Sequence, residues 1–242
     1  MKSAQLKRLT LVFATAGLMA AGSAHSDNLV TDINSQGIGS GLSFGYTFDG
    51  THTNRTVGTF DVTNTTAGTS FLAFCADILT DVAGTAVVGQ EFEAVSTLTF
   101  FGTAVGNDVQ ALFDQRYGLL DLADNAQTSA FAISLWEIIH DNGDKTTGSG
   151  SLIWDNPQDG SSPDIVAIKN GVLATADQWL SSLADPTVED TYDLTVWQTA
   201  ASGAESQPYI QASLPSSSVP VPGTLALGLA SLIGFGVVRR RR

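Results

Sequence analysis

The chain has 242 residues, 43% of them hydrophobic, and carries a formal net charge of −13 at pH 7. This negative charge makes nucleic acid and anionic membrane surfaces poor partners. A single cysteine, Cys75, excludes an intramolecular disulfide, although the chain has the features of an exported protein described below.

Residues 1–26 have the pattern of a secretory signal peptide. The basic residues Lys2, Lys7 and Arg8 precede an apolar stretch, residues 9–21, that is too short for a stable membrane span. Small residues suited to cleavage follow this stretch. We therefore expect export across the inner membrane and a mature chain that begins near residue 27.

The first half of the remaining chain has the pattern of β-strands. Residues 42–48 alternate bulky apolar residues with small or polar ones, which predicts a half-buried antiparallel strand. Residues 70–77 are apolar on both faces, which predicts a central strand covered on both sides. Weaker patterns predict strands at residues 57–63 and 91–99.

The second half changes to helical periodicity. Apolar spacing and capping residues predict three helices, at residues 108–122, 124–140 and 164–183. A polar loop, residues 141–162, separates the last two. Alternating residues then predict two closing strands, at residues 192–197 and 208–214. Together these elements predict an α+β ectodomain over residues 27–212, an antiparallel β-sandwich or barrel-like sheet with an inserted helical subdomain.

A short linker, residues 213–218, leads to a tail with three parts. The parts are the segment Val219, Pro220, Val221 and Pro222, an uncharged apolar run over residues 223–238, and the cluster Arg239, Arg240, Arg241 and Arg242. As a helix the apolar run would measure about 24 Å. Flanking residues can extend it to membrane thickness, and the arginines resist transfer across the bilayer. We expect a transmembrane helix at residues 223–238 with the C-terminus in the cytoplasm.

This three-part order resembles the PEP-CTERM sorting signal. Pro220 and Pro222 match the two prolines of that signal, and Val221 replaces the acidic residue between them. The resemblance implies that an exosortase-type membrane peptidase is a partner and removes the tail over residues 219–242. It also implies release to the cell surface or extracellular matrix of a bacterium that makes exopolysaccharide.

The charge of the ectodomain differs from that of the whole chain. Once both ends are set aside, four basic residues remain against all 24 acidic ones, a net charge of about −20. Such a charge favours cations, neutral glycans or basic surfaces as partners. It also keeps an extracellular protein soluble without any binding role.

Two stretches of the ectodomain carry a second resemblance. They are Phe74-Cys75-Ala76-Asp77, in the predicted central strand, and the helical run AFAISLWEI at residues 130–138. Together they resemble the thioester domains of bacterial surface adhesins and their PEP-CTERM relatives. In that family a cysteine on a strand bonds to a glutamine side chain early in a helix, and the internal thioester captures a nucleophile. The resemblance implies covalent adhesion through Cys75.

The glutamine position of that helical motif is occupied here by Ala132. Ala132 lies four residues before Trp136 and has no carboxamide. The nearest glutamine, Gln127, lies five residues earlier, and five helical residues add about 140° of rotation, so its side chain should point elsewhere. We therefore expect the scaffold without the reactive bond, with Cys75, Ala132 and Gln127 as a degenerate thioester site.

Without a thioester, Cys75 has two interpretations. Free cysteine is among the most buried residue types, so a small buried hydrophobe is expected. The alternative is a nucleophile paired with His52 or His140, because a thiol needs a base or a lowered pKa. Neither histidine belongs to a recognisable catalytic motif, and the sequence contains no zinc, phosphate-loop or Gly-x-Ser-x-Gly pattern.

Four aspartates are weak calcium candidates. Asp141, Asp144, Asp155 and Asp159 supply hard oxygen ligands of the kind that Ca²⁺ prefers. Their spacing does not fit the twelve-residue calcium loop, so we expect solvated turns, no metal and no cofactor.

From the sequence we expect a non-enzymatic, exported protein that is anchored in the membrane before processing. Its expected partners are the sorting peptidase and then exopolysaccharide or other surface polymers. Covalent adhesion through a variant thioester at Cys75 is the alternative, and a secreted hydrolase is the third interpretation.

Overall fold

The computed structural model describes residues 39–80, 91–141, 144–155, 162–183, 190–200 and 206–215. The predicted signal peptide, residues 1–26, and the predicted sorting signal, residues 219–242, lie outside these ranges. Within them, no helix combines the length and the apolar character that crossing a membrane requires.

The described strands form one sheet of seven, in the order β4-β6-β7-β3-β2-β1-β5, and every pairing is antiparallel. The prediction of mixed α+β structure on an antiparallel sheet is confirmed, whereas the described strands make a single sheet rather than two facing ones. The strands are β1 Ser40–Phe48, β2 Thr51–Asn64, β3 Thr69–Cys75, β4 Phe92–Ser96, β5 Leu152–Trp154, β6 Asp193–Thr199 and β7 Tyr209–Ser213.

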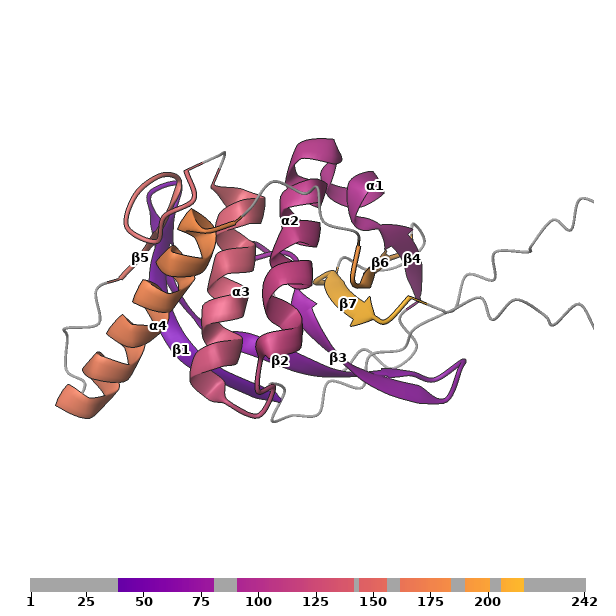
Figure 1. The fold of residues 1–242 in the computed structure, drawn as a ribbon, viewed down its shortest axis with the longest axis horizontal. Coiled ribbons are helices and arrows are strands. Elements are labelled where there is room, and N and C mark those ends of the chain that lie inside the picture. Colours follow the sequence, from indigo (N-terminus) through magenta and orange to yellow (C-terminus); the bar gives the residue numbers. More distant parts are fainter. Residues whose placement is uncertain are drawn as a thin grey trace, which may run out of the picture.

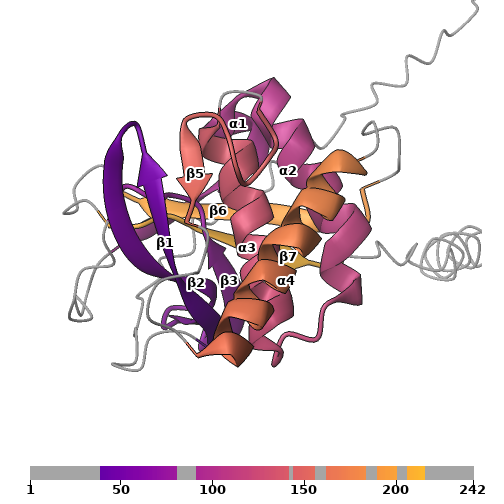
Figure 2. The ribbon, with the colours of Figure 1, turned by 90° about the vertical axis from the view of Figure 1, so that its left-hand side faces the viewer.

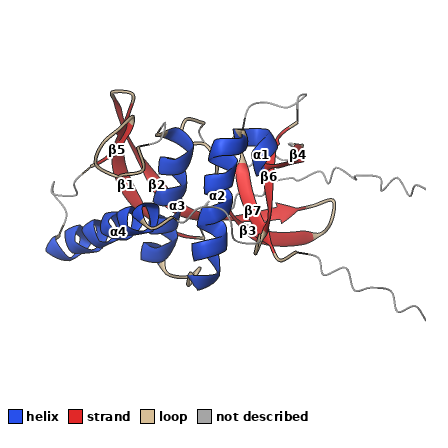
Figure 3. Cartoon of the chain, turned by 45° about the horizontal axis from the view of Figure 1, so that its top comes forward, coloured by secondary structure: helices blue, strands red, loops and turns tan. Residues whose placement is uncertain are grey.

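The helices are an insertion between two neighbouring strands. Strands β4 and β6 pair directly, although four helices lie between them in the sequence. Figures 1 and 2 show α2, α3 and α4 side by side in one layer against the sheet, and Figure 3 shows the same layer from above. The helices are α1 Thr97–Phe101, α2 Thr103–Arg116, the 3₁₀ turn η1 Tyr117–Leu119, α3 Asn125–His140 and α4 Pro163–Ser181.

Apolar residues cover both faces of the central strand β3. On one face, Phe74 contacts the rings of Phe113 in α2 and Phe131 in α3, with centroids 6.2 and 4.6 Å apart. Successive residues of a strand point to opposite faces, so Phe71 lies on the other one. There its ring stacks on Trp197 of β6 at 6.1 Å. Coverage on both faces therefore holds for the end of β3, whereas its first residues are exposed and Phe71 is only partly buried.

Helix α3 lies close to strands β1 and β2 because small residues form the contact. The Ser129 hydroxyl accepts from the Leu42 amide at 2.9 Å and donates to the Val57 carbonyl at 2.7 Å. Between the two strands, a side chain on Gly41 or Gly58 would collide with the backbone of the opposite strand. Helix α3 is therefore fixed to the sheet by hydrogen bonds as well as by apolar contact.

Several predicted boundaries differ from the structure. The strand predicted at residues 91–99 ends at Ser96, whose hydroxyl accepts from the Thr99 amide and caps α1. The helix predicted at residues 108–122 begins at Thr103 and ends at Arg116. Strand β2 begins six residues before the predicted residue 57, and the short strand β5 lies inside the predicted loop, residues 141–162.

Candidate functional site

Strand β3 becomes progressively more buried toward its end and places Cys75 in the interior. The Cys75 side chain is 1% exposed. Burial raises the pKa of its thiol well above the ordinary value, and the backbone N–H of Asp77 opposes this only in part. The thiol is therefore protonated at neutral pH, and burial of Cys75 agrees with the sequence-based expectation.

Gln207 lies against this thiol. In the β3–β7 pairing Tyr209 stands opposite Cys75, and Gln207, two residues before Tyr209, projects to the same side. The Gln207 Nε2 contacts Cys75 Sγ directly. It also donates to the Asp77 carbonyl at 2.7 Å, and the same carbonyl accepts from the Cys75 thiol at 2.9 Å. One backbone oxygen thus holds both the sulfur and the carboxamide.

Helix α3 closes this site through Trp136. The Trp136 indole N–H donates to the Cys75 carbonyl at 2.9 Å, so the two stretches that carried the resemblance meet in space. The Trp136 ring stacks on Trp154 with centroids 5.9 Å apart, and Tyr46 lies edge-on at 6.3 Å. These rings fix the indole, and the indole fixes the end of β3.

Neither Ala132 nor Gln127, which the sequence placed with Cys75 in a degenerate thioester site, supplies a carboxamide to Cys75. Ala132 is buried in the core of α3. The Gln127 amide donates to Asp124 at 3.1 Å and accepts from the Asp121 amide at 3.0 Å, so it belongs to the N-terminal cap of the helix. The carboxamide at Cys75 comes from Gln207, which the motif did not indicate. Gln207 directly precedes the strand predicted at residues 208–214, and no local pattern in the sequence marks it.

Neither histidine pairs with the thiol. His52 Nε2 lies 2.7 Å from Asp155 Oδ2 at an exposed position. His140 Nε2 accepts from the Ile78 amide at 3.3 Å, and burial lowers its pKa. The arrangement of a cysteine hydrolase, with a thiol donating to an imidazole, is therefore not formed by the described residues.

Two of the four aspartates predicted as weak calcium ligands, Asp141 and Asp144, bond within their own segment of the chain. Asp141 accepts from the Ser151 and Leu152 amides, and Asp144 accepts from the Ser149 hydroxyl at 2.9 Å. Asp155 pairs with His52, and Asp159 lies outside the described residues. In the part of the chain that the structure describes, no three potential ligands converge on a point.

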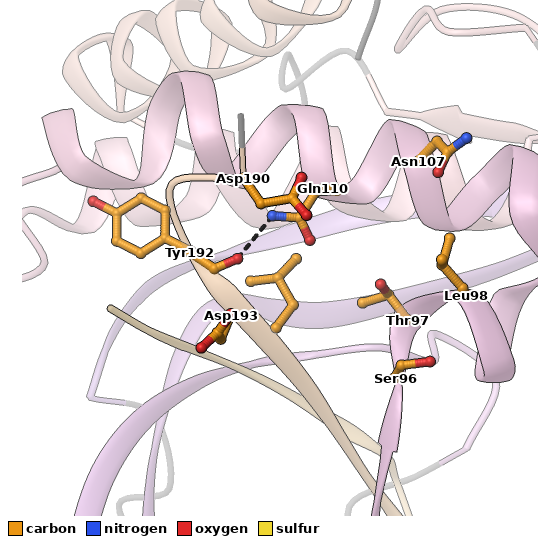
Figure 4. Close-up of a pocket in the computed structure, with 9 residues that line it drawn as sticks. Ser96, Thr97, Leu98, Asn107, Gln110, Asp190, Tyr192 and Asp193 are labelled. Carbon is orange, nitrogen blue, oxygen red and sulfur yellow. Dashed lines mark hydrogen bonds between the residues drawn. The ribbon is translucent and has the colours of Figure 1, made fainter. Parts of the chain in front are cut away.

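A separate hollow of about 250 Å³ lies between the start of α1, the helix α2 and the start of β6. Figure 4 shows Ser96, Thr97 and Leu98 on one side of it and Asp190, Tyr192 and Asp193 on the other. The Gln110 amide crosses it and donates to the Tyr192 carbonyl at 2.9 Å. Its lining contains neither Cys75 nor Gln207, and Gln110 Nε2 already donates to Asp114 of its own helix as well as to Tyr192.

The sequence matches no protein-family profile and none of the curated proteins. Among solved structures, the fold is similar to the N-terminal domain of the Streptococcus pyogenes pilus tip adhesin Cpa. The identity is 12%, the similarity covers 65% of this chain and 84% of that one, and the TM-score is 0.41.

Proposed function

We propose that Cys75 and Gln207 form an internal thioester, through which the domain attaches covalently to a nucleophile on a surface or in a polymer matrix. The observation that carries this proposal is the shared position of the two side chains. The Gln207 carboxamide contacts the thiol, and both donate to the carbonyl of Asp77. Two reacting groups held together in this way react as an intramolecular pair, which removes much of the entropic barrier.

The reaction balances with no added reagent. Cys75 Sγ attacks Gln207 Cδ, the Sγ–Cδ bond forms and the Cδ–Nε2 bond breaks. The thiol proton passes to the departing nitrogen, which leaves as ammonia. An amine that later attacks the same carbon restores the thiol and leaves an amide on Gln207. Each molecule can do this once, so the proposed role is not enzymatic.

The surroundings of Gln207 favour the thioester over the free pair. Its Oε1 is buried without a hydrogen-bond partner in the structure, and a buried unpartnered amide oxygen costs about 1 to 3 kcal/mol. A thioester carbonyl is a weaker acceptor than an amide carbonyl because sulfur donates less electron density, so burying it costs less. The low exposure of Gln207, 6%, also protects the bond from water.

Export supplies the setting for this chemistry. The predicted signal peptide and sorting tail, with an exosortase-type peptidase as partner, support a place at the cell surface or in an exopolysaccharide matrix. Amines on neighbouring proteins, or hydroxyls on polymers, would then be the nucleophiles within reach. The strong negative charge of the ectodomain favours partners with basic surfaces.

The intact mass of the folded protein tests the proposal. Formation of the thioester removes one ammonia, so we expect a mass about 17 Da below that of the processed chain. Treatment with methylamine should then raise the mass and label Gln207, as identified by peptide mapping. Cys75→Ser and Gln207→Ala should each abolish both the mass loss and the labelling.

Gln127→Ala is the matched control, because Gln127 is a glutamine of the same domain whose amide is bonded to Asp121 and Asp124. This variant should keep the mass loss and the methylamine labelling. A wild-type protein with the full calculated mass and a thiol that can be titrated after unfolding would show that the pair stays unreacted.

A further inference from the structure

The peptide group between Asp77 and Ile78 joins the Cys75–Gln207 pair to His140. Its carbonyl accepts hydrogen bonds from the Cys75 thiol at 2.9 Å and from Gln207 Nε2 at 2.7 Å. Its N–H, on the opposite edge of the same plane, donates to His140 Nε2 at 3.3 Å. The imidazole therefore holds one edge of a rigid group whose other edge holds both reacting side chains.

Two nearby hydrogen bonds do not act on the Asp77–Ile78 peptide itself. The Ile78 carbonyl accepts from the Tyr46 hydroxyl at 3.2 Å, and the Asp77 carboxylate accepts from the Leu79 amide at 2.7 Å. Both bonds act on atoms outside the Asp77–Ile78 peptide plane itself. Because hydrogen bonds to the two ends of one amide polarise it cooperatively, the bond to His140 also strengthens the carbonyl as an acceptor.

We propose that His140 is a positioning residue for the thioester, and that its neutral form is required to hold the Asp77 carbonyl in place. This inference rests on the proposed function. Nε2 can accept from the Ile78 amide only when the proton of the neutral ring is on Nδ1. A protonated ring has hydrogen on both nitrogens, so it repels the Ile78 N–H and releases the peptide.

The same carbonyl acts when the thioester is opened. The nitrogen of an attacking amine takes the position that Nε2 of Gln207 occupied, because attack is the reverse of ammonia loss. The Asp77 carbonyl can then accept a hydrogen from the attacking nitrogen at the place where it accepts from Nε2. His140 should therefore influence both the yield of the thioester and the rate of amine capture.

The groups around His140 set the direction of its pH dependence. Strand β1 places the Phe48 ring edge-on to it at 5.7 Å, and the segment after β3 contributes the Asp77 charge. On its own helix the neighbouring titratable groups are Glu137 and Asp141. Burial lowers the pKa of His140 and the Asp77 charge opposes this, with burial the larger effect. The ring is thus neutral at pH 7 and becomes charged only in more acidic solution.

Two substitutions separate the hydrogen bond from the packing. His140→Phe keeps a ring but removes the acceptor, whereas His140→Gln keeps an acceptor oxygen at similar reach and cannot titrate. We expect His140→Phe to lower the fraction with the 17 Da loss, or to slow methylamine capture by about 10- to 100-fold. His140→Gln should retain the thioester and capture methylamine at a rate near that of the wild type at pH 8.

The pH profile then distinguishes positioning from packing. Protonation of methylamine slows capture in every variant as the pH falls, so the informative quantity is the ratio of the wild-type rate to the His140→Gln rate. We expect this ratio to be constant near neutral pH and to fall about tenfold per pH unit below the pKa of His140. If His140→Phe does not fold, as judged by its melting curve, this ratio decides alone.

A constant ratio between pH 4.5 and pH 8, or a folded His140→Phe variant that captures methylamine as the wild type does, would overturn the role of His140 and leave the proposed thioester intact. A wild-type chain without the mass loss would overturn both.

Discussion

Glu137 is a carboxyl group that the fold keeps without its charge. It is 1% exposed, and its Oε1 accepts from the Trp154 indole N–H at 2.6 Å. Its Oε2 and the Oδ2 of Asp141, one turn further along the helix, are both buried and unpartnered. Burial, with the charge of Asp141 adding to it, raises the pKa of Glu137 to about 10. A proton on Glu137 Oε2 gives the two carboxyl groups a hydrogen to share.

This protonation makes stability depend on pH. Glutamate in the unfolded chain ionises near its ordinary pKa of 4.5, while folded Glu137 keeps its proton up to about pH 10. The unfolded state therefore binds fewer protons between these values, and the contribution of Glu137 to stability falls as the pH rises through this window. It is fully present below about pH 4.5.

Replacing Glu137 with glutamine should remove that loss. The glutamine keeps an acceptor for Trp154 and offers an N–H toward Asp141 at every pH. At pH 8 we expect the free energy of unfolding of Glu137→Gln to exceed that of the wild type by about 1 to 3 kcal/mol, and its melting temperature to be higher. The difference should shrink toward pH 5. Melting curves at intervals between pH 5 and pH 9 measure it. Two curves that stay parallel across this range would mean that Glu137 is ionised in the folded protein.

Helix α3 is the element that joins the sheet to the site. Its N-terminal half is fixed to β1 and β2 by Ser129, and its C-terminal half reaches Cys75 through Trp136 and the Ile78 amide through His140. A shift of the helix relative to the sheet would therefore move the donor and the acceptor that position the end of β3. The attachment at Ser129 contributes to the geometry of the site from the other end of the helix.

Two buried serines on α3 allow a matched test of this attachment. Ser129→Ala would leave the Leu42 amide and the Val57 carbonyl without their shared partner, which should lower stability by about 1 to 3 kcal/mol. Ser134→Ala should cost less than about 0.5 kcal/mol, because that hydroxyl donates only to the Ala130 carbonyl of its own helix. Denaturant unfolding of both variants gives the difference. Equal losses would show that the bonds to the sheet add nothing beyond burial.

The elements with strong periodicity were predictable, and those formed only by pairing were not. Strand β1 alternates apolar and polar residues, β3 and α3 are almost continuously apolar, and α4 begins at a proline suited to a first turn, so their existence followed from the sequence. The first residues of β2, Thr51 to Thr56, are polar and become a strand because they pair with β1. Likewise the three residues of β5 are defined by their pairing with β1.

The same distinction holds for the candidate site: the residues in local motifs were predictable, and the residue placed by strand pairing was not. Cys75 and Trp136 stand in short motifs that mark them, and the structure brings them together. Gln207 is separated from Cys75 by 132 residues and reaches it through the β3–β7 pairing. No local pattern distinguishes Gln207 from the other glutamines of the chain, so only the order of strands in the sheet identifies it.

At the scale of the whole molecule, we propose that the predicted signal peptide and the predicted sorting tail determine where the domain acts. We predict cleavage between about Pro220 and Gly223 in a host that has the sorting peptidase, because proline disfavours helical backbone and a peptidase binds extended chain more readily. Deletion of Arg239 to Arg242 should leave the chain unprocessed and poorly retained. Mass spectrometry of the surface form measures the outcome, and a surface form that still contains residues 225–242 would contradict sorting by this tail.

The position of Gln207 has a mechanical consequence. In the proposed reaction, capture would leave the new covalent bond on the Gln207 side chain, not on Cys75. From Gln207 toward the predicted anchor, the chain contains β7 and then the residues that follow Ser213. While the tail is still in the membrane, a pull between the captured partner and the cell is therefore carried by this one strand and linker. Among the described elements, strands β1 to β6 and the four helices lie upstream of the load, so tension would not lengthen the tether by unravelling them.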